Sequence, residues 1–296
     1  MGLGRKSNTW KEGEPDADPA FSLGSRRMEA AVAGGPLNDR VDVRVFEWEG
    51  GDLDALVAEV EAYDPQLIGL SVYLWSLPTL LAVAHGLKKN DPRRVILAGG
   101  PSARPAMLAH APFRPWVGCL DALCMAEGEP AFTGVAQAML EGRPLSDVPG
   151  LALPTSLDGW RNTPEADAAD LNDLPSAYTL GRARTGVGYI ETYRGCPLSC
   201  SFCEWGVISS NRPPLSADNI VADFEALEAM NCGAVFLVDA ALNLNPKAFR
   251  NLHEAEKRTG FLSRRPLHCE VYPGKVTDEH MDFLKGIPAT VGLGLQ

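Results

Sequence analysis

The feature that most constrains this chain is a run of three cysteines, Cys196, Cys200 and Cys203, at the spacing C-x3-C-x2-C. The run follows an apolar strand pattern and leads into a loop that contains proline. Three thiolates from one short loop can hold three irons of a cubane iron–sulfur cluster, and the fourth iron then stays open for an exchangeable ligand. The spacing therefore predicts a metal centre with one reactive position.

Two alternatives account for the cysteines less well. A structural zinc site needs four closed ligands, usually as two C-x2-C pairs, and the chain offers one such pair. The distant candidates for a fourth ligand are Cys232, His268 and Cys269. Buried thiols can also act as small hydrophobes, but three within eight residues, beside arginine, proline and glycine, are an unusual way to fill a core.

The run Arg194-Gly195-Cys196-Pro197-Leu198-Ser199-Cys200-Ser201-Phe202-Cys203 resembles the cluster loop of radical S-adenosylmethionine (SAM) enzymes. Trp205 and Gly206, which follow it, resemble the subgroup that carries an N-terminal cobalamin-binding domain. The resemblance implies that the three cysteines ligate a [4Fe-4S] cluster and that Phe202 packs near the adenine of SAM. It also implies that SAM chelates the open iron and that reduction cleaves it to a 5′-deoxyadenosyl radical.

The length and composition of the chain indicate how many domains it can form, which partners suit it and in which compartment it is expected. The 296 residues suffice for two ordinary domains, and 45% hydrophobic with 22% charged residues are typical of a soluble globular protein. The net charge of −11 argues against a nucleic-acid or anionic-membrane surface, so we expect a small-molecule or peptide substrate. Seven cysteines, an odd number, do not indicate a disulfide framework, and we expect a cytoplasmic protein. Neither a membrane span nor a signal-peptide core is found.

The first half alternates between strand and helix patterns after residues 1–20, for which we expect a disordered leader. The predicted helices cover residues 22–33, 52–63, 79–89, 103–110 and 130–140, and the predicted strands cover 41–48, 67–74, 94–98 and 122–125. Strands that alternate with helices in this way predict an α/β fold with a parallel, doubly wound sheet over residues 21–147.

Ligands of such sheets bind beyond the carboxyl ends of the strands. The candidate residues at these ends are Ser71, Tyr73, Leu74, Trp75 and Ser76, then Gly99, Gly100 and Pro101, then Glu127, Gly128 and Glu129. Taken alone, Gly-Gly-Pro is only a sharp turn. Together the segments resemble the cobalamin domain of the same subgroup, with Ala126 where that family has glycine in its Gly-Glu-Gly-Glu loop.

The Asp-x-His-x-x-Gly motif that supplies a histidine to cobalt elsewhere is missing, because neither His85 nor His110 has that context. Resemblance to the carbapenem-type methylases of this subgroup places Trp75 below the cobalt. The alternative is that Trp75 packs in the core or in the seam between domains, as large aromatics usually do.

Residues 148–185 form a predicted linker with a short hairpin over 151–161, and residues 186–296 carry successive β/α units. These units resemble the partial barrel of radical SAM enzymes, in which the site lies at the carboxyl ends of the strands. Candidates to face the cluster loop there are Asp239, Asn243, Glu270 and Gln296. The family often has Gly-Gly-Glu where this chain has Asp239-Ala240-Ala241.

The barrel pattern stops after about four of the family's six units, and we expect a truncated form. The leading interpretation is a cobalamin-dependent radical SAM methyltransferase that acts, through methylcobalamin, on an unactivated carbon of a natural-product intermediate. Its cofactors are a [4Fe-4S] cluster, SAM and cobalamin, and its implied partner is an external electron donor of the flavodoxin or ferredoxin type. The alternatives are non-methylating rearrangement or ring chemistry with the same cofactors, and a non-catalytic cofactor-binding remnant.

Overall fold

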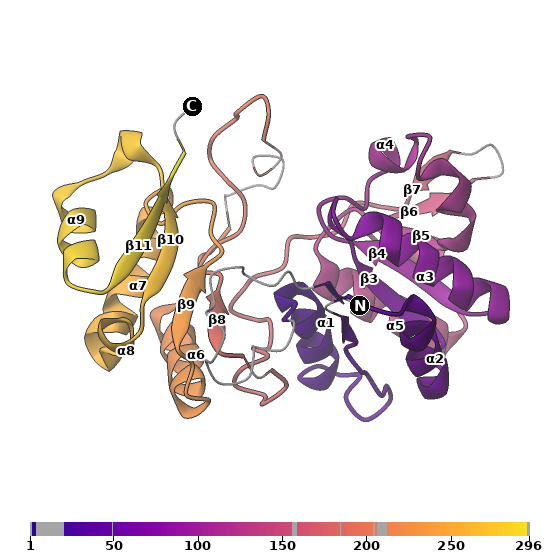
Figure 1. Ribbon diagram of the computed structural model, residues 1–296, viewed down its shortest axis with the longest axis horizontal. Helices are drawn as coiled ribbons and strands as arrows, with labels where there is room; N and C mark the ends of the chain where they lie inside the picture. Colours follow the sequence, from indigo (N-terminus) through magenta and orange to yellow (C-terminus); the bar gives the residue numbers. More distant parts are fainter. Residues whose placement is uncertain are drawn as a thin grey trace. The chain divides into compact units, whose positions relative to one another are not determined.

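The computed structural model describes residues 2–3, 21–48, 50–155, 159–183, 185–203, 205 and 212–294. The chain divides into two compact units, Met1–Ala168 and Ala169–Gln296 (Figure 1). No helix within the described ranges is long and apolar enough to cross a membrane. The domain boundaries at 20, 147 and 185 stay predictions, although the first unit extends through the hairpin that we expected within a linker.

The sheet of the first unit has five strands in the order β3-β4-β5-β6-β7. Three are parallel, β3 (Leu67–Ser71), β4 (Val95–Gly99) and β5 (Ala122–Cys124), and the hairpin β6 (Leu151–Pro154) and β7 (Trp160–Asn162) adds two antiparallel strands at one edge. The predicted parallel sheet is thus mixed. Its three parallel strands end at the same edge, since Ser71 pairs with Gly99.

Helices cover both faces of this sheet, as a doubly wound fold requires. The helices of the first unit are α1 (Leu23–Ala33), α2 (Leu53–Tyr63), α3 (Leu77–Asn90), α4 (Pro105–Leu108) and α5 (Gly128–Glu141), with 3-10 turns at Arg114–Cys119 and Leu145–Asp147. Ile68 and Leu70 point toward α2 and α3, whereas Leu67, between them in alternation, packs with residues of α1 and α5. This period of two is what a strand buried on both faces shows.

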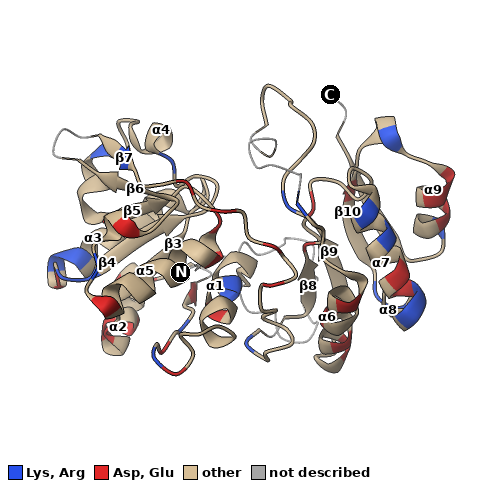
Figure 2. Ribbon diagram, turned by 180° about the vertical axis from the view of Figure 1, so that it is seen from behind, with Lys and Arg blue, Asp and Glu red and all other residues tan. Residues whose placement is uncertain are grey.

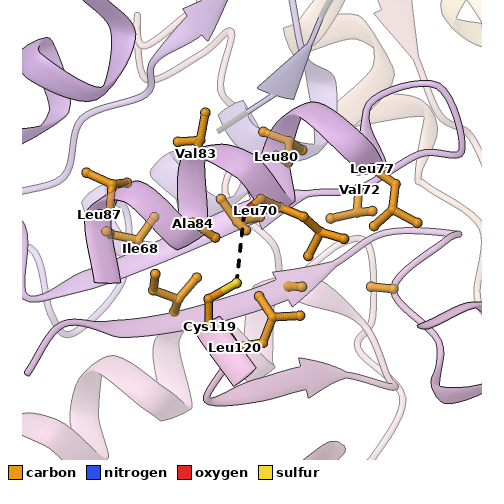
Figure 3. Close-up of a cluster of buried hydrophobic side chains, with 14 of the residues drawn as sticks. Ile68, Leu70, Val72, Leu77, Leu80, Val83, Ala84, Leu87, Cys119 and Leu120 are labelled. Carbon is orange, nitrogen blue, oxygen red and sulfur yellow. Dashed lines mark hydrogen bonds between the residues drawn. The ribbon is translucent and has the colours of Figure 1, made fainter. Parts of the chain in front are cut away.

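The larger core lies between α3 and the sheet (Figure 3). Leu80, Ala84 and Leu87 recur at helical spacing on α3 and are fully buried against the strands. Cys119, at the end of the first 3-10 turn, closes this core and donates a weak hydrogen bond to the carbonyl of Leu81 at 3.9 Å. The residues of this core all belong to the first unit, so the packing that supports its carboxyl edge lies within that unit.

The strand predicted over residues 41–48 is wrong for 41–46, since only β2 (Glu47–Trp48) is a strand. It pairs in parallel with β1 (Gly2–Leu3), so the expectation that residues 1–20 contain no strand is also wrong at these two positions. Residues 41–45 do alternate between half-buried and exposed side chains, and Phe46 is buried. Alternation reports one covered face, but a strand also needs a backbone partner. The remainder of the predicted leader lies outside the described residues.

The second unit has a four-stranded, fully parallel sheet in the order β11-β10-β9-β8. Its strands are β8 (Val187–Ile190), β9 (Ala234–Leu237), β10 (Leu267–Val271) and β11 (Ala289–Leu293), and its helices are α6 (Ala217–Ala229), α7 (Pro246–Thr259), α8 (Phe261–Arg264) and α9 (Asp278–Lys285), with a 3-10 turn at Pro273–Lys275. Sequential order with helical crossovers is the arrangement of a partial β/α barrel. The predicted fold class is confirmed.

The helices of the second unit begin where the sequence indicates. Ser216, Asn245 and Thr277 each cap a helix with a side-chain oxygen that accepts a backbone N–H of the first turn. Acidic residues recur along α6 and α9, and α7 carries residues of both signs (Figure 2). Arg258 of α7 pairs with Asp218 of α6 at 2.7 Å, which ties two neighbouring helices at the surface.

Candidate functional site

The carboxyl edge of the first sheet brings together the three loops predicted for cobalamin. β3 and β4 end in register at Ser71 and Gly99. Gly100 has φ +98°, and a Cβ there would lie 2.7 Å from the carbonyl oxygen of Val72. The two loops therefore touch through their backbones, and only glycine allows this approach. Ser71 faces inward, because its hydroxyl would lie 3.5 Å from a Cβ placed on Gly24 of α1.

The strand predicted to reach Leu74 ends at Ser71, and the chain then turns. Ser76 is buried and makes this turn, since its hydroxyl accepts from the N–H of Tyr73 at 2.9 Å and donates to the Tyr73 carbonyl at 3.2 Å. The turn presents Leu74, 57% exposed, and Trp75, 65% exposed. Trp75 stacks on Tyr73 with ring centroids 4.9 Å apart and an interplanar angle of 16°.

Trp75 is thus outside the core of its own unit, contrary to one of the two alternatives considered for it. A stacked aromatic pair at the carboxyl edge offers a flat apolar surface beside the Gly99–Gly100 backbone. The position of Trp75 below a cobalt ion stays a prediction. Ser76 supports the turn and has its hydroxyl occupied by that role.

The third loop leads from β5 into α5. Gly128 is the first residue of α5 and lies against Met28, whose sulfur would be 3.0 Å from a Cβ at that position. Glu129 is buried in the first turn, while Glu127 forms the N-cap. Ala126 packs against Gly150, where an added Cβ would lie 2.7 Å from the alanine methyl. The alanine in place of the family's glycine is therefore accommodated by a glycine opposite.

The cysteine run leaves the carboxyl end of β8. Cys196 and Cys200 are half-buried and Cys203 is exposed, and Phe202 and Trp205 beside them are 68% and 48% exposed. Gly206 lies outside the described residues. No cysteine of the chain forms a disulfide. Within the described ranges, no group of three or more His, Cys, Asp or Glu side chains is gathered as a metal site, so ligation by these thiols stays a prediction.

The other four cysteines differ from these three in burial and in chemistry. Burial raises the pKa of Cys119 and Cys124 to about 11 and that of Cys269 to about 12. Cys232 is buried, accepts from the N–H of Gly188 at 3.1 Å and donates to the carbonyl of Ala234 at 2.9 Å. A thiolate is the ligand form, and the raised pKa values of Cys119, Cys124 and Cys269 disfavour it. The accessible thiols of the loop fit an iron–sulfur centre better than the zinc site with Cys232 or Cys269.

The start of the cysteine loop is held by charge and by backbone geometry. Arg194 pairs with Glu191 at 3.2 Å, and both side chains are mostly buried. Gly195 follows with φ +83°, a conformation that favours glycine. The chain therefore turns sharply immediately before Cys196.

Asp239 and Asn243, both candidates to contact SAM, are buried and bonded within the unit. Asp239 accepts from the backbone N–H of Thr192 at 2.7 Å and of Tyr193 at 3.3 Å. Asn243 donates to the Tyr272 carbonyl at 2.8 Å and accepts from the Tyr272 N–H at 2.9 Å. Burial raises the pKa of Asp239 to about 7 despite these donors. Sequence reasoning missed Thr192 and Tyr193, although a polar pair directly before the cysteine run is a readable signal.

Glu270 stands on the face of the second sheet that the helices leave open. The register places Tyr189, Phe236, His268 and Thr290 in one row across that face. Glu270 lies further toward the carboxyl end, paired with Gly292, and a Cβ on Gly292 would lie 2.4 Å from a Glu270 carboxylate oxygen. The missing side chain of Gly292 thus makes room for this carboxylate, another signal that the sequence reading missed. Gln296 lies outside the described residues.

Comparisons with known proteins agree with this arrangement. The B12 binding domain model matches residues 29–136, and the radical SAM superfamily model matches residues 190–296. The 2-(S-pantetheinyl)-carbapenam-3-carboxylate methyltransferase of Streptantibioticus cattleyicolor is 29% identical over 216 residues, which are 67% of this chain and 31% of that protein. The cobalamin-dependent radical SAM methyltransferase TokK of Streptomyces tokunonensis is 28% identical over 214 residues, with the same two shares.

Among solved structures, the radical SAM methyltransferase TsrM of Kitasatospora setae, with a tryptophan substrate and a SAM analogue bound, has a TM-score of 0.73 and 19% identity. The match covers 99% of this chain and 58% of that chain, and at this identity it shows the fold. The chain spans about a third of the length of the two curated relatives described above.

Proposed function

We propose, on the premise that this chain belongs to the radical SAM superfamily and carries a B12-binding domain, that it takes part in cobalamin-dependent radical methyl transfer to an unactivated carbon. The observation that carries the proposal is the contrast among the cysteines. Three thiols, one exposed and two half-buried, follow the carboxyl end of one strand of a parallel β/α unit, while the other four cysteines are buried. Partial barrels place their chemistry at that end of the strands.

Cys196, Cys200 and Cys203 would hold a [4Fe-4S] cluster through their thiolates. Bound there, the cluster supplies the electron that cleaves SAM, and cobalamin in the first unit carries the methyl group. Phe202 and Trp205 offer exposed aromatic surface next to the cysteines, which suits contact with an adenine ring. Glu270, on the open face, offers a carboxylate that suits the ammonium group of SAM.

The first unit would bind cobalamin at its carboxyl edge. Gly99 and Gly100 bring backbone rather than side chains to that edge, which lets a large planar ring approach closely. The stacked pair Tyr73 and Trp75 adds a flat apolar surface there. Since no histidine motif for cobalt ligation occurs in the sequence, we assign the lower face of the ring to Trp75.

The partners follow from charge and from the cofactor set. The net charge of −11 suits a small natural-product or peptide substrate rather than a nucleic acid or an anionic membrane. Reductive cleavage of SAM requires an external one-electron donor, for which a flavodoxin or ferredoxin is suitable. Three accessible thiols persist unoxidised in a reducing compartment, so we assign the protein to the cytoplasm.

The experiment is anaerobic reconstitution with iron and sulfide, followed by EPR spectra of the reduced protein with and without SAM. Cys200→Ser and Cys232→Ser make the same chemical change, and serine can take over the hydrogen bonds of Cys232. We expect a cluster signal that shifts when SAM is added in the wild type and in Cys232→Ser, and that is lost in Cys200→Ser. Recovery of zinc instead of iron, or equal signals in both variants, would overturn the proposal.

Retention of cobalamin and analysis of the product distinguish the alternatives. SAM cleavage together with a methylated product supports methyl transfer. Cleavage with a rearranged, unmethylated product supports the ring chemistry alternative, and bound cobalamin without SAM cleavage supports a binding remnant. SAM cleavage and product formation are measured with the full-length protein.

A further inference from the structure

Thr192 follows the end of β8, and it is also hydrogen-bonded to the segment that leads into α6. The β8–β9 ladder ends with Ile190 paired to Leu237, and the N–H of Val238 then donates to the Ile190 carbonyl at 2.8 Å. Beyond this point the two strands separate, and the backbone groups of residues 192 and 193 need other partners.

The Asp239 carboxylate supplies those partners. One oxygen, Oδ1, accepts from the N–H of Thr192 at 2.7 Å and from the N–H of Tyr193 at 3.3 Å. The other, Oδ2, makes a short hydrogen bond with the Thr192 hydroxyl. Asp239 is 4% exposed and Thr192 is 2% exposed, so water does not compete with these bonds. A side chain thus continues the ladder for two residues after the strands part.

The segment that leads into α6 is hydrogen-bonded to Thr192 as well. The N–H of Leu215 donates to the Thr192 carbonyl at 2.8 Å, directly before the Ser216 cap of α6. The carbonyl of Leu215 in turn accepts from the Asn251 side chain at 2.7 Å. Thr192 therefore uses its N–H and hydroxyl toward β9 and its carbonyl toward the segment that follows the cysteine run.

Tyr193 makes a second connection between the same two segments. Its hydroxyl donates to the carbonyl of Ala241 at 2.7 Å and accepts from the Ala241 N–H at 3.1 Å. Burial raises the pKa of the Tyr193 phenol, which keeps the proton for this bond. The residues before Cys196 are thus fixed to the segment that follows β9 by two side chains, those of Asp239 and Tyr193.

We propose that Thr192 and Asp239 form an anchor that positions the cysteine run, by fixing the residues before it both to the segment that follows β9 and to the segment that leads into α6. The inference rests on the proposed function, because it assigns the anchor to holding the three thiols for a cluster. Both are positioning residues, since neither touches the reacting groups. Closing a long loop at one fixed point removes conformational freedom that cluster ligation would otherwise have to remove.

The test uses two matched pairs of variants. Thr192→Val removes the hydroxyl and keeps the shape, whereas Thr192→Ser keeps the hydroxyl. Asp239→Ala removes every bond of the carboxylate, whereas Asp239→Asn keeps an acceptor for the two backbone N–H groups and offers an N–H to the threonine oxygen. Hydrogen exchange of the Tyr193 and Leu215 amides is measured in the apoprotein, and the rate of iron loss to a chelator is measured in the reconstituted protein.

We expect both rates to rise about tenfold in Thr192→Val and more in Asp239→Ala, and to stay within about twofold of wild type in the serine and asparagine variants. Thermal melts establish that each variant is folded; if Asp239→Ala is not, the threonine pair decides. Unchanged exchange and iron loss in a folded Thr192→Val would overturn the anchor. A wild-type protein that forms no cluster would overturn the proposed function instead. Amide exchange in the apoprotein variants would still test whether Thr192 and Asp239 form the anchor.

Discussion

Gly100 provides a sharp test of the carboxyl edge of the first unit. In Gly100→Ala the new Cβ would lie 2.7 Å from the carbonyl oxygen and 3.0 Å from the nitrogen of Val72, and the backbone keeps φ at +98°. The neighbouring backbone resists a shift, because the Val72 N–H donates to Gly99 at 2.7 Å and the Ser102 N–H donates to Val72 at 3.2 Å. The substitution therefore strains the contact between two of the loops assigned to cobalamin.

The free-energy cost of Gly100→Ala has two parts. A non-glycine residue in the left-handed region costs about 1–2 kcal/mol, and weakening one or two of the backbone hydrogen bonds costs about 1 kcal/mol each. We expect Gly100→Ala to lower the free energy of unfolding of the first unit by about 2–4 kcal/mol, which lowers its melting temperature by roughly 5–15 °C. Gly99→Ala is the matched control, since its Cβ would meet the Cys124 Cβ at 3.5 Å, an ordinary contact.

Scanning calorimetry under anaerobic conditions measures the melting temperatures, and absorbance of added cobalamin measures binding. We expect Gly100→Ala to melt lower than Gly99→Ala and to bind cobalamin more weakly than the wild type. Equal melting temperatures for the two variants would refute the close-approach argument, whatever their cobalamin affinity.

Three further predictions concern the second unit. Because burial raises the pKa of Asp239 from an ordinary 3.8 to about 7, the folded state holds a proton that the unfolded state has lost between these values. The free energy of unfolding should then fall by up to about 1.4 kcal/mol per pH unit as the pH rises through this window, and Asp239→Asn should flatten the dependence in urea titrations. Gly292→Ala should displace the Glu270 carboxylate and weaken SAM binding in calorimetric titrations while leaving the cluster EPR signal intact; unchanged affinity would remove Glu270 from the SAM site. Phe224→Ala should destabilise the unit by about 3–5 kcal/mol in urea unfolding, since this ring is fully buried 4.7 Å from that of Phe261; a loss below 1 kcal/mol would contradict its place in the core.

Helix starts were predictable from the sequence because capping is local. The helices predicted over residues 22–33 and 52–63 form there, and Ser22 and Asp52 cap them through N–H groups two or three residues ahead. A strand was wrongly predicted over residues 41–46, because a strand depends on a backbone partner that the local sequence does not specify. β3 likewise ends three residues before the apolar run does, because the Ser76 hydroxyl takes the Tyr73 N–H and turns the chain.

The candidate site residues also differ in how far the sequence could predict their surroundings. The cysteine run was readable because its three residues are close in the sequence and share one loop. The bonds of Asp239 to Thr192 and Tyr193 join residues 46 or 47 positions apart, and they depend on the register between β8 and β9. A sequence shows that a polar residue follows a strand, but not whether its side chain turns toward a ligand or toward the next strand.

At the carboxyl edge of the second unit, the polar residues that follow β9 are bonded within the protein. Asp239 serves the residues after β8, and Asn243 serves Tyr272 after β10, so two polar residues that follow β9 bond to the strands on its two sides. Buried carboxylates and amides with their hydrogen bonds filled are poor ligand groups, because a ligand would have to replace those bonds. The groups that the internal network leaves available for the proposed cofactor contacts are the cysteine run and Glu270. Asp239 and Asn243 therefore stabilise the carboxyl edge of this sheet, and we expect the exposed side chains, not these two, to contact the cofactors.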